Sequence, residues 1–221
     1  MTEPKPDLPT RRGAAAGRRI AQVLLRSLWS VQVSGAEQVP AQGAVILAPN
    51  HTGFIDGPLL MCAAPRPTHA LAKQELFRGP LGWLLRAVGQ IPLDRGDPGR
   101  GLIKAGLGVL TDGQVLVVFP EGTRGTGDFS DLRTGLAWFA LRSGAPVVPV
   151  VFRGTSPRGR TLKGLPGLRS RLDVAFGEPI IVSSEGGRSR SALEAATVQL
   201  RAALVAHRET VLAPTPDEES T

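Results

Sequence analysis

Segment 50–56 (NHTGFID) contains residues whose types and spacing could support acid–base chemistry. His51 follows a short apolar run, residues 44–48, and Asp56 comes five positions later in a helix-like run. A carboxylate at that spacing can reach one imidazole nitrogen, which fixes the tautomer and makes the other nitrogen a stronger base. The pair would then be the base of an acyl-transfer site. The same spacing also fits a surface histidine beside an aspartate that caps a helix.

Segment 119–124 (FPEGTR) has the composition of an anion-binding turn. It follows a continuous β-branched run, and Gly122 would let the backbone turn tightly after it. Such a turn can leave amide N–H groups free, while Thr123 offers a hydroxyl and Arg124 a guanidinium for a phosphate. Glu121 would either hold Arg124 in place or accept a hydrogen bond from a substrate hydroxyl.

Two further arginines lie where they could reach the same anion. Arg95 belongs to segment 89–96 (GQIPLDRG), which includes an earlier strand, and Arg133 precedes a helix. Arginines from separate loops can clamp one phosphate. Taken singly, each is more often a solvated surface charge, so it is their joint placement after strands that favours a shared site.

The secondary structure between these segments must position them. Short apolar runs predict buried strands at residues 45–48, 69–73, 89–93, 115–119, 146–152, 172–176 and 180–182. Helical spacing of apolar residues predicts helices at residues 18–33, 55–64, 76–88 (with a break at 79–80), 99–111, 135–143 and 189–209. This alternation predicts an α/β fold, a single domain with a mostly parallel or mixed sheet flanked by helices. In such sheets the working loops lie beyond the carboxyl ends of the strands, where the segments above fall.

The ends of the chain differ in composition from its middle. Residues 1–17 are expected to form a disordered basic tail, residues 18–209 one domain, and residues 210–221 a polar tail. The first predicted helix is amphipathic and has Trp29 and several arginines. Such a helix could lie in a membrane interface, pack on the core, or do both.

Composition narrows the choice of partners. The net charge is +7, which favours an anionic membrane surface, a phosphate-bearing substrate or nucleic acid. Aromatic residues make up 5% of the chain, too few for the stacking that single-stranded nucleic acid needs, so no nucleic acid is expected. No His/Cys cluster suggests a metal, and the single Cys62 fits a reducing compartment. Without a signal peptide or an apolar run of spanning length, we expect a cytoplasmic protein, peripheral on the inner face of the cell membrane.

Four of these segments together resemble the glycerolipid acyltransferase family. The family's motifs are matched, in order and spacing, by segments 50–56, 89–95, 119–124 and 147–150. The resemblance spans about residues 20–185 and implies a glycerol-3-phosphate acyltransferase-like fold. The chain departs from the family at Arg133, where many members have lysine, and in the absence of the N-terminal membrane span that many members carry.

The resemblance implies an O-acyltransferase of phospholipid biosynthesis, which moves a fatty acyl group from acyl-CoA or acyl carrier protein to the hydroxyl of a lysophospholipid. The family implies lysophosphatidic acid as the acceptor and phosphatidic acid as the product, and other lysolipids or hydroxylated acceptors stay open. His51 would be the general base and Asp56 would orient it, with no cofactor beyond the thioester co-substrate and no metal. The predicted substrate-binding residues are Arg95, Glu121, Gly122, Thr123, Arg124 and Arg133.

A different class of protein also stays open, a non-catalytic module that docks on anionic lipid. The basic cluster that supports it consists of Arg158, Arg160, Lys163, Arg169 and Arg171. Thiol release from an acyl thioester that requires both a lysophospholipid and His51 would separate the enzyme from the module. The oligomeric state is open as well.

Overall fold

Strands and helices alternate along the chain, as predicted for an α/β fold. The structure, a computed structural model, describes residues 10–93, 100–122, 124–130, 132–156, 165–182 and 189–213. The strands in these ranges are β1 (Ser30–Ser34), β2 (Val45–Pro49), β3 (Thr68–Lys73), β4 (Ile91–Leu93), β5 (Val115–Val117), β6 (Val147–Arg153) and β7 (Arg171–Phe176). The helices are α1 (Arg11–Leu28), η1 (Ala36–Gln38), α2 (Asp56–Ala63), η2 (Gln74–Phe77), α3 (Gly79–Ala87), α4 (Arg100–Thr111), α5 (Gly135–Ser143) and α6 (Arg190–Leu212).

The strands form one sheet in the order β1-β7-β6-β2-β5-β3-β4. Neighbouring strands run parallel except for the antiparallel pair β6 and β7. This confirms the predicted mostly parallel, mixed sheet. All five residues of β2 are buried, as its uninterrupted apolar sequence predicts for a strand that is covered on both faces.

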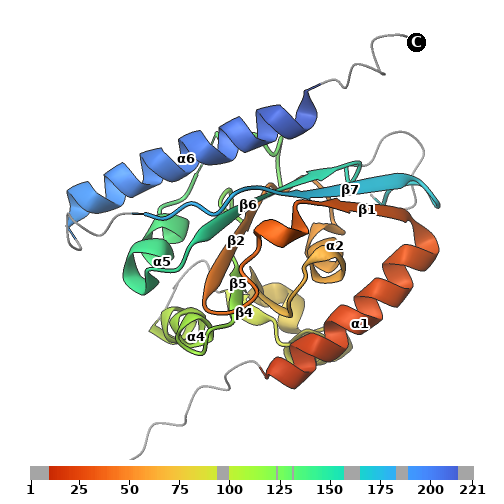
Figure 1. Cartoon of the computed structure of the whole chain (residues 1–221). Coiled ribbons are helices and arrows are strands. Elements are labelled where there is room, and N and C mark those ends of the chain that lie inside the picture. The colour runs from red at the N-terminus through yellow and green to blue at the C-terminus, as the bar shows by residue number, and fades with distance from the viewer. Residues whose placement is uncertain are drawn as a thin grey trace, which may run out of the picture.

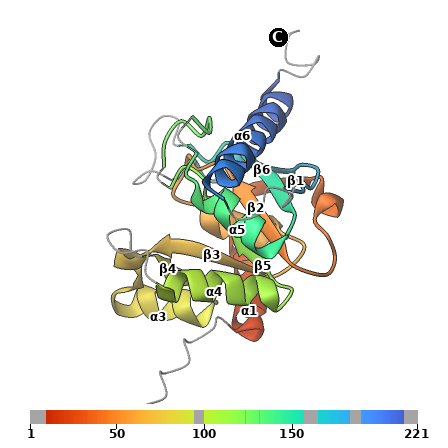
Figure 2. The ribbon, with the colours of Figure 1, turned by 90° about the vertical axis from the view of Figure 1, so that its left-hand side faces the viewer.

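Helices cover both faces of the sheet, and the sheet separates the hydrophobic core into two layers. Val45 and Leu47 of β2 pack in one cluster with residues of α1 and α2. Ile46 and Ala48, which alternate with them, pack in the other cluster with residues of α4, α5 and α6. Figure 1 shows α1 and α2 on one side of the strands and α4 and α5 on the other. Figure 2 looks from the side of α4 and α5, which lie in front of the strands.

The first helix differs from its prediction at both ends. It begins at Arg11, earlier than the predicted range 18–33, because the Thr10 hydroxyl accepts from the Gly13 amide and caps the first turn. Residues 30–33, expected as its last turn, instead belong to β1, which pairs in parallel with β7. Val31 continues the helical spacing of Leu24 and Leu28, whereas Val31 and Val33 alternate as in a strand. Pairing with a strand far along the chain decides between them.

Other predicted elements are found with smaller shifts. The predicted strand 180–182 is reduced to an antiparallel bridge between Ile180 and Val147, because only Ile180 exchanges backbone hydrogen bonds with β6. The break between η2 and α3 lies at Arg78, just before the predicted break at 79–80, and Pro80 lies in the first turn of α3, where a missing N–H is tolerated. Helix α6 continues to Leu212, slightly beyond its predicted end.

Helix α1 packs on the core through one face and exposes a second apolar face. Its buried residues are Ala14, Gly17, Ala21 and Leu25. The exposed apolar face consists of Ile20, Val23, Leu24 and Leu28. The predicted packing on the core is therefore confirmed, and the exposed face is what a position in a membrane interface would require. None of the described helices is both long enough and apolar enough to cross a membrane.

Candidate active site

His51 and Asp56 are in direct contact, as predicted from their spacing. The Nδ1 atom of His51 lies 2.8 Å from Oδ2 of Asp56. The His51 side chain is 22% exposed, whereas the Asp56 side chain is fully buried. Because the carboxylate occupies Nδ1, Nε2 is the nitrogen that can take a proton from a substrate.

The loop before α2 wraps around the Asp56 carboxylate. The backbone amides of Thr52 and Gly53 both donate to Oδ2, each at 2.8 Å. Oδ2 therefore accepts from two amides in addition to facing His51, which stabilises a buried negative charge. The second oxygen, Oδ1, is buried without a hydrogen-bond partner among the described residues. The aspartate thus orients the histidine and closes the loop with the same atom.

Asn50 fixes the point at which this loop leaves the sheet. Its side chain is buried and bridges to β6, since Oδ1 accepts from the Phe152 amide at 2.8 Å and Nδ2 donates to the Phe152 carbonyl at 3.4 Å. The side chain therefore continues the pairing of β2 and β6 beyond Pro49. The sequence analysis gave Asn50 no role. Its position directly after a buried strand was the available signal.

The loop after β5 packs directly against His51. The Gly125 amide donates to the His51 carbonyl at 2.9 Å, and the Phe119 ring lies 4.3 Å from the imidazole, centroid to centroid. Gly122 has a φ of +67°, a conformation that suits glycine, and the Arg133 side chain packs against it. The tight turn predicted at Gly122 is therefore present.

Glu121 is buried in this loop and helps to close it. Its Oε1 accepts from the Phe129 amide at 3.2 Å. Burial raises the pKa of Glu121 above its ordinary value, and the bond from Phe129 offsets part of that rise. Phe129, fully buried with a φ of 60°, has no role in the sequence analysis, because a positive φ at phenylalanine has no compositional signal. One of the two roles predicted for Glu121 was to hold Arg124. The carboxylate instead accepts from the Phe129 amide and has no bond to Arg124.

Two of the predicted arginines lie on this loop with exposed side chains. The guanidinium carbon of Arg124 is 5.5 Å from the centroid of the Phe54 ring, and the Arg133 amide donates to the Pro120 carbonyl at 2.9 Å. The side chain of Arg133 packs against Gly122, in the turn that also carries Arg124. The predicted binding residues Arg95 and Thr123 lie outside the described residues.

A third loop, after β6, joins the site through Thr155. Its side chain is fully buried, and its Oγ1 lies 2.9 Å from Oγ1 of Thr52. Gly53 packs so closely on this loop that a Cβ atom there would lie 2.3 Å from the Thr155 carbonyl oxygen. The site is therefore assembled from the loops at the carboxyl ends of β2, β5 and β6. The sequence analysis missed Thr155, although it follows a predicted strand.

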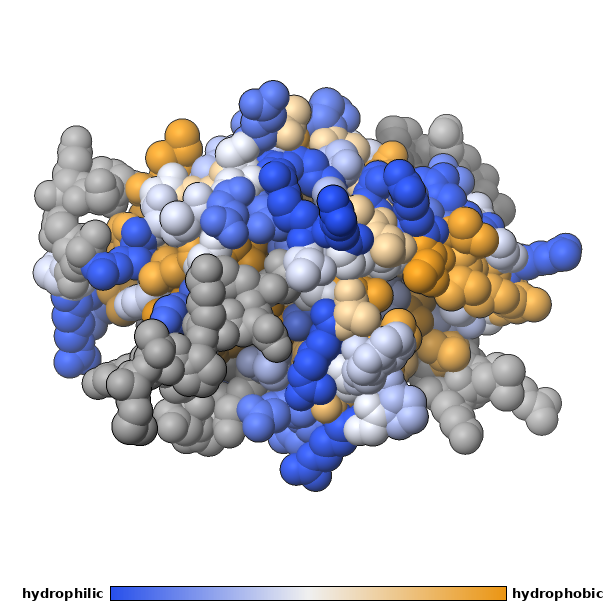
Figure 3. Space-filling view, turned by 90° about the horizontal axis from the view of Figure 1, so that it is seen from below, coloured by the Kyte–Doolittle hydropathy of each residue, from blue (hydrophilic) through white to orange (hydrophobic). Residues whose placement is uncertain are grey.

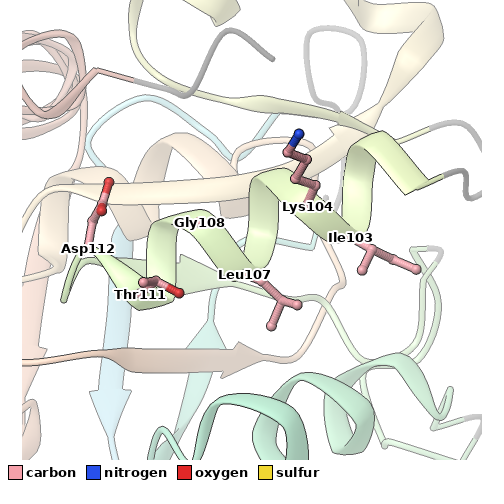
Figure 4. Close-up of a pocket in the computed structure, with 6 residues that line it drawn as sticks. All are labelled: Ile103, Lys104, Leu107, Gly108, Thr111 and Asp112. Carbon is pink, nitrogen blue, oxygen red and sulfur yellow. The ribbon is translucent and has the colours of Figure 1, made fainter. Parts of the chain in front are cut away.

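A separate hollow runs along α4, lined by Ile103, Lys104, Leu107, Gly108, Thr111 and Asp112. Figure 4 shows Ile103 and Leu107 on the same side of the helix. None of these residues belongs to the three loops of the candidate site. Within the described ranges, no group of three or more His, Cys, Asp or Glu residues has the arrangement of a metal site.

Solved structures include one with the same fold. The crystal structure of the 1-acyl-sn-glycerophosphate (LPA) acyltransferase PlsC from Thermotoga maritima aligns with a TM-score of 0.68 and 25% sequence identity. The alignment covers 92% of this chain and 80% of the Thermotoga chain. The predicted acyltransferase-like fold is therefore confirmed.

Sequence similarity leads to the same group of proteins. A 1-acyl-sn-glycerol-3-phosphate acyltransferase of Bacillus subtilis is 30% identical over 161 residues, which are 72% of this chain and 78% of the relative. A protein of the same name from Streptococcus pneumoniae is 32% identical over 166 residues, covering 71% and 59% of the two chains. The Acyltransferase family model matches residues 30–153, which contain the His51–Asp56 pair and the loop after β5. The chain belongs to the acyltransferase family.

Proposed function

We propose that this protein transfers a fatty acyl group from an acyl thioester to the hydroxyl of a lysophospholipid, converting lysophosphatidic acid to phosphatidic acid. The observation that carries the proposal is the 2.8 Å contact of His51 with a buried Asp56, beside a turn with two exposed arginines. The relatives from Bacillus and Streptococcus, named for acylation of 1-acyl-sn-glycerol-3-phosphate, support this acceptor.

In the proposed reaction the acceptor hydroxyl attacks the thioester carbonyl carbon. Nε2 of His51 removes the hydroxyl proton as the new C–O bond forms, and Asp56 stabilises the resulting imidazolium. When the tetrahedral intermediate collapses, the C–S bond breaks and His51 returns the proton to the leaving thiolate. The acceptor hydroxyl is the nucleophile, so no covalent enzyme intermediate is needed.

The phosphate of the acceptor would bind to the arginines of the turn after β5. Guanidinium groups bind phosphate in a bidentate way, and two of them can neutralise its charge. Arg124 and Arg133 are proposed for this role, together with Arg95 and Thr123, while Glu121 and Gly122 shape the turn. The packing of Arg133 on Gly122 supports their joint action.

We further propose that the protein works on an anionic membrane surface, at the cytoplasmic leaflet of the cell membrane. The exposed apolar face of α1 and the exposed Trp83 of α3 support this position. Figure 3 shows hydrophobic surface at the right-hand end of the lower face, where α1 lies in Figure 1. The net charge of +7 would add attraction to anionic lipids. Of the basic cluster noted in the sequence, Arg158, Arg160 and Lys163 lie outside the described residues.

The decisive experiment measures thiol release from long-chain acyl-CoA and from acyl carrier protein thioesters, with a panel of lysolipids read by mass. Release should require both lysophosphatidic acid and His51, and His51→Ala should lower kcat by roughly 10² to 10⁴-fold. Binding to anionic vesicles without any turnover would favour the non-catalytic module. A His51→Ala variant with wild-type kcat would remove the proposed base.

A further inference from the structure

Phe54 is a large aromatic side chain that faces solvent beside the candidate base. It is 56% exposed, although it lies between His51 and Asp56 in the chain. A single exposed phenylalanine is common on protein surfaces, so exposure by itself indicates no function. What distinguishes Phe54 is its contact with Arg124, whose guanidinium carbon lies 5.5 Å from the ring centroid. That distance is within the range of a cation–π interaction.

The backbone that carries the Phe54 ring is held on both sides. Before it, the Gly53 amide donates to the Asp56 carboxylate at 2.8 Å. After it, Ile55 is buried in the core and its carbonyl accepts from the Leu59 amide at 2.8 Å. The ring is thus attached to a short segment whose position is fixed by contacts that do not involve the ring.

Arg124, by contrast, is a long side chain on an exposed turn. Among the described residues it has no hydrogen-bond or ion-pair partner. A guanidinium that stacks on a ring keeps its N–H edges available for an anion in its own plane. The Phe54 ring therefore restricts where the Arg124 side chain can lie and leaves its donors available.

We infer that Phe54 is a positioning residue for Arg124, which it holds ready for the phosphate of the acceptor. The inference rests on the proposed function, in which Arg124 binds that phosphate. A cation–π contact at an exposed site corresponds to about a two- to five-fold difference in affinity. Phe54 should therefore lower the KM for the phosphate-bearing acceptor and leave the chemical step unchanged.

A double-mutant cycle tests this inference, with lysophosphatidic acid and acyl-CoA as substrates. Leucine keeps the apolar bulk without the π face, so Phe54→Leu should raise the acceptor KM about two- to five-fold with kcat and donor KM unchanged. Phe54→Tyr, which keeps the ring, should behave like the wild type. In an Arg124→Ala background, Phe54→Leu should have no further effect. Because Phe54 is exposed, no variant should lose more unfolding free energy than the cation–π contact itself contributes.

Two results would overturn the inference. One is a wild-type acceptor KM in Phe54→Leu, and the other is an equal effect of that change with and without Arg124. The second result would mean that the ring contacts the acyl chain or the membrane on its own. Calorimetric binding of a short-chain lysophosphatidic acid to the same variants gives a readout that needs no turnover. Coupled losses of binding in a protein without turnover would support the inference and overturn the proposed reaction.

Discussion

Replacement of Asp56 by asparagine would separate the two tasks of its carboxylate. Oδ2 accepts from the amides of Thr52 and Gly53 and contacts Nδ1 of His51. The side-chain oxygen of asparagine can accept from all three groups, so the loop and the histidine tautomer should persist. The amide nitrogen would take the place of Oδ1, which has no partner among the described residues. What the variant loses is the negative charge beside the imidazolium.

The size of the effect follows from that charge. Two unit charges about 4 Å apart attract each other by about 4 kcal/mol at an effective dielectric constant of about 20, and this separation fits groups whose atoms meet at 2.8 Å. Each 1.36 kcal/mol is about tenfold in rate, so kcat of Asp56→Asn should fall roughly 10³-fold. Asp56→Ala would in addition leave the buried Gly53 amide without an acceptor, at about 1–3 kcal/mol of unfolding free energy, and remove the acceptor of the half-buried Thr52 amide.

The assay is thiol release at saturating lysophosphatidic acid and acyl-CoA, together with urea unfolding of each variant. We expect Asp56→Asn to unfold close to the wild type with a low kcat, and Asp56→Ala to lose both stability and activity. A kcat of Asp56→Asn within tenfold of the wild type would refute the reasoning. Asp56 would then only close the loop, which is the helix-cap alternative that the sequence left open.

Three further predictions concern groups around the site and on α1. Because burial raises the pKa of Glu121 above 4.5, the protonated form is favoured in the folded state, and the unfolding free energy should fall as pH rises from 4.5 through the raised pKa. Glu121→Gln should lack that slope when melting temperatures are compared across this pH range. Thr155→Val should lower the unfolding free energy by about 0.5–1.5 kcal/mol in urea titrations, because it removes the bond to Thr52, and the same change in a Thr52→Val background should cost less. Val23→Glu should weaken sedimentation with anionic vesicles, and Val198→Glu should not, since both valines are similarly exposed (68% and 69%) and only Val23 lies on the apolar face of α1.

The central strands of the fold were predictable because their own sequences are apolar throughout. The runs around Leu47 and Val117 are apolar without interruption, and only burial on both faces explains that pattern. The loop between β2 and α2 follows from those strands, so the contact of His51 with Asp56 could be expected from spacing. Each of these features depends on residues that are close together in the sequence.

Features that depend on distant residues were missed. The strand β1 forms by pairing with β7, and the sequence hides it because Val31 also continues the helical spacing of Leu24 and Leu28. Thr155 meets Thr52 because β6 lies beside β2, and nothing in either segment alone indicates that neighbour. Phe129 adopts a positive φ because the surrounding loop holds it there, with Glu121 on its amide. Local sequence patterns cannot predict these features, because they depend on tertiary contacts between residues far apart in the sequence.

The close approach of Gly53 to the Thr155 carbonyl divides the site into positions that can vary and positions that cannot. A methyl group at Gly53 would separate the loop of the base from the loop after β6, so this contact has to be preserved in any redesign. Phe54, Arg124 and Arg133 are exposed residues, and of the three only Arg133 packs on a glycine, Gly122. An effort to give this enzyme a new acceptor should therefore randomise those three surface positions and keep the glycine backbone beneath them constant.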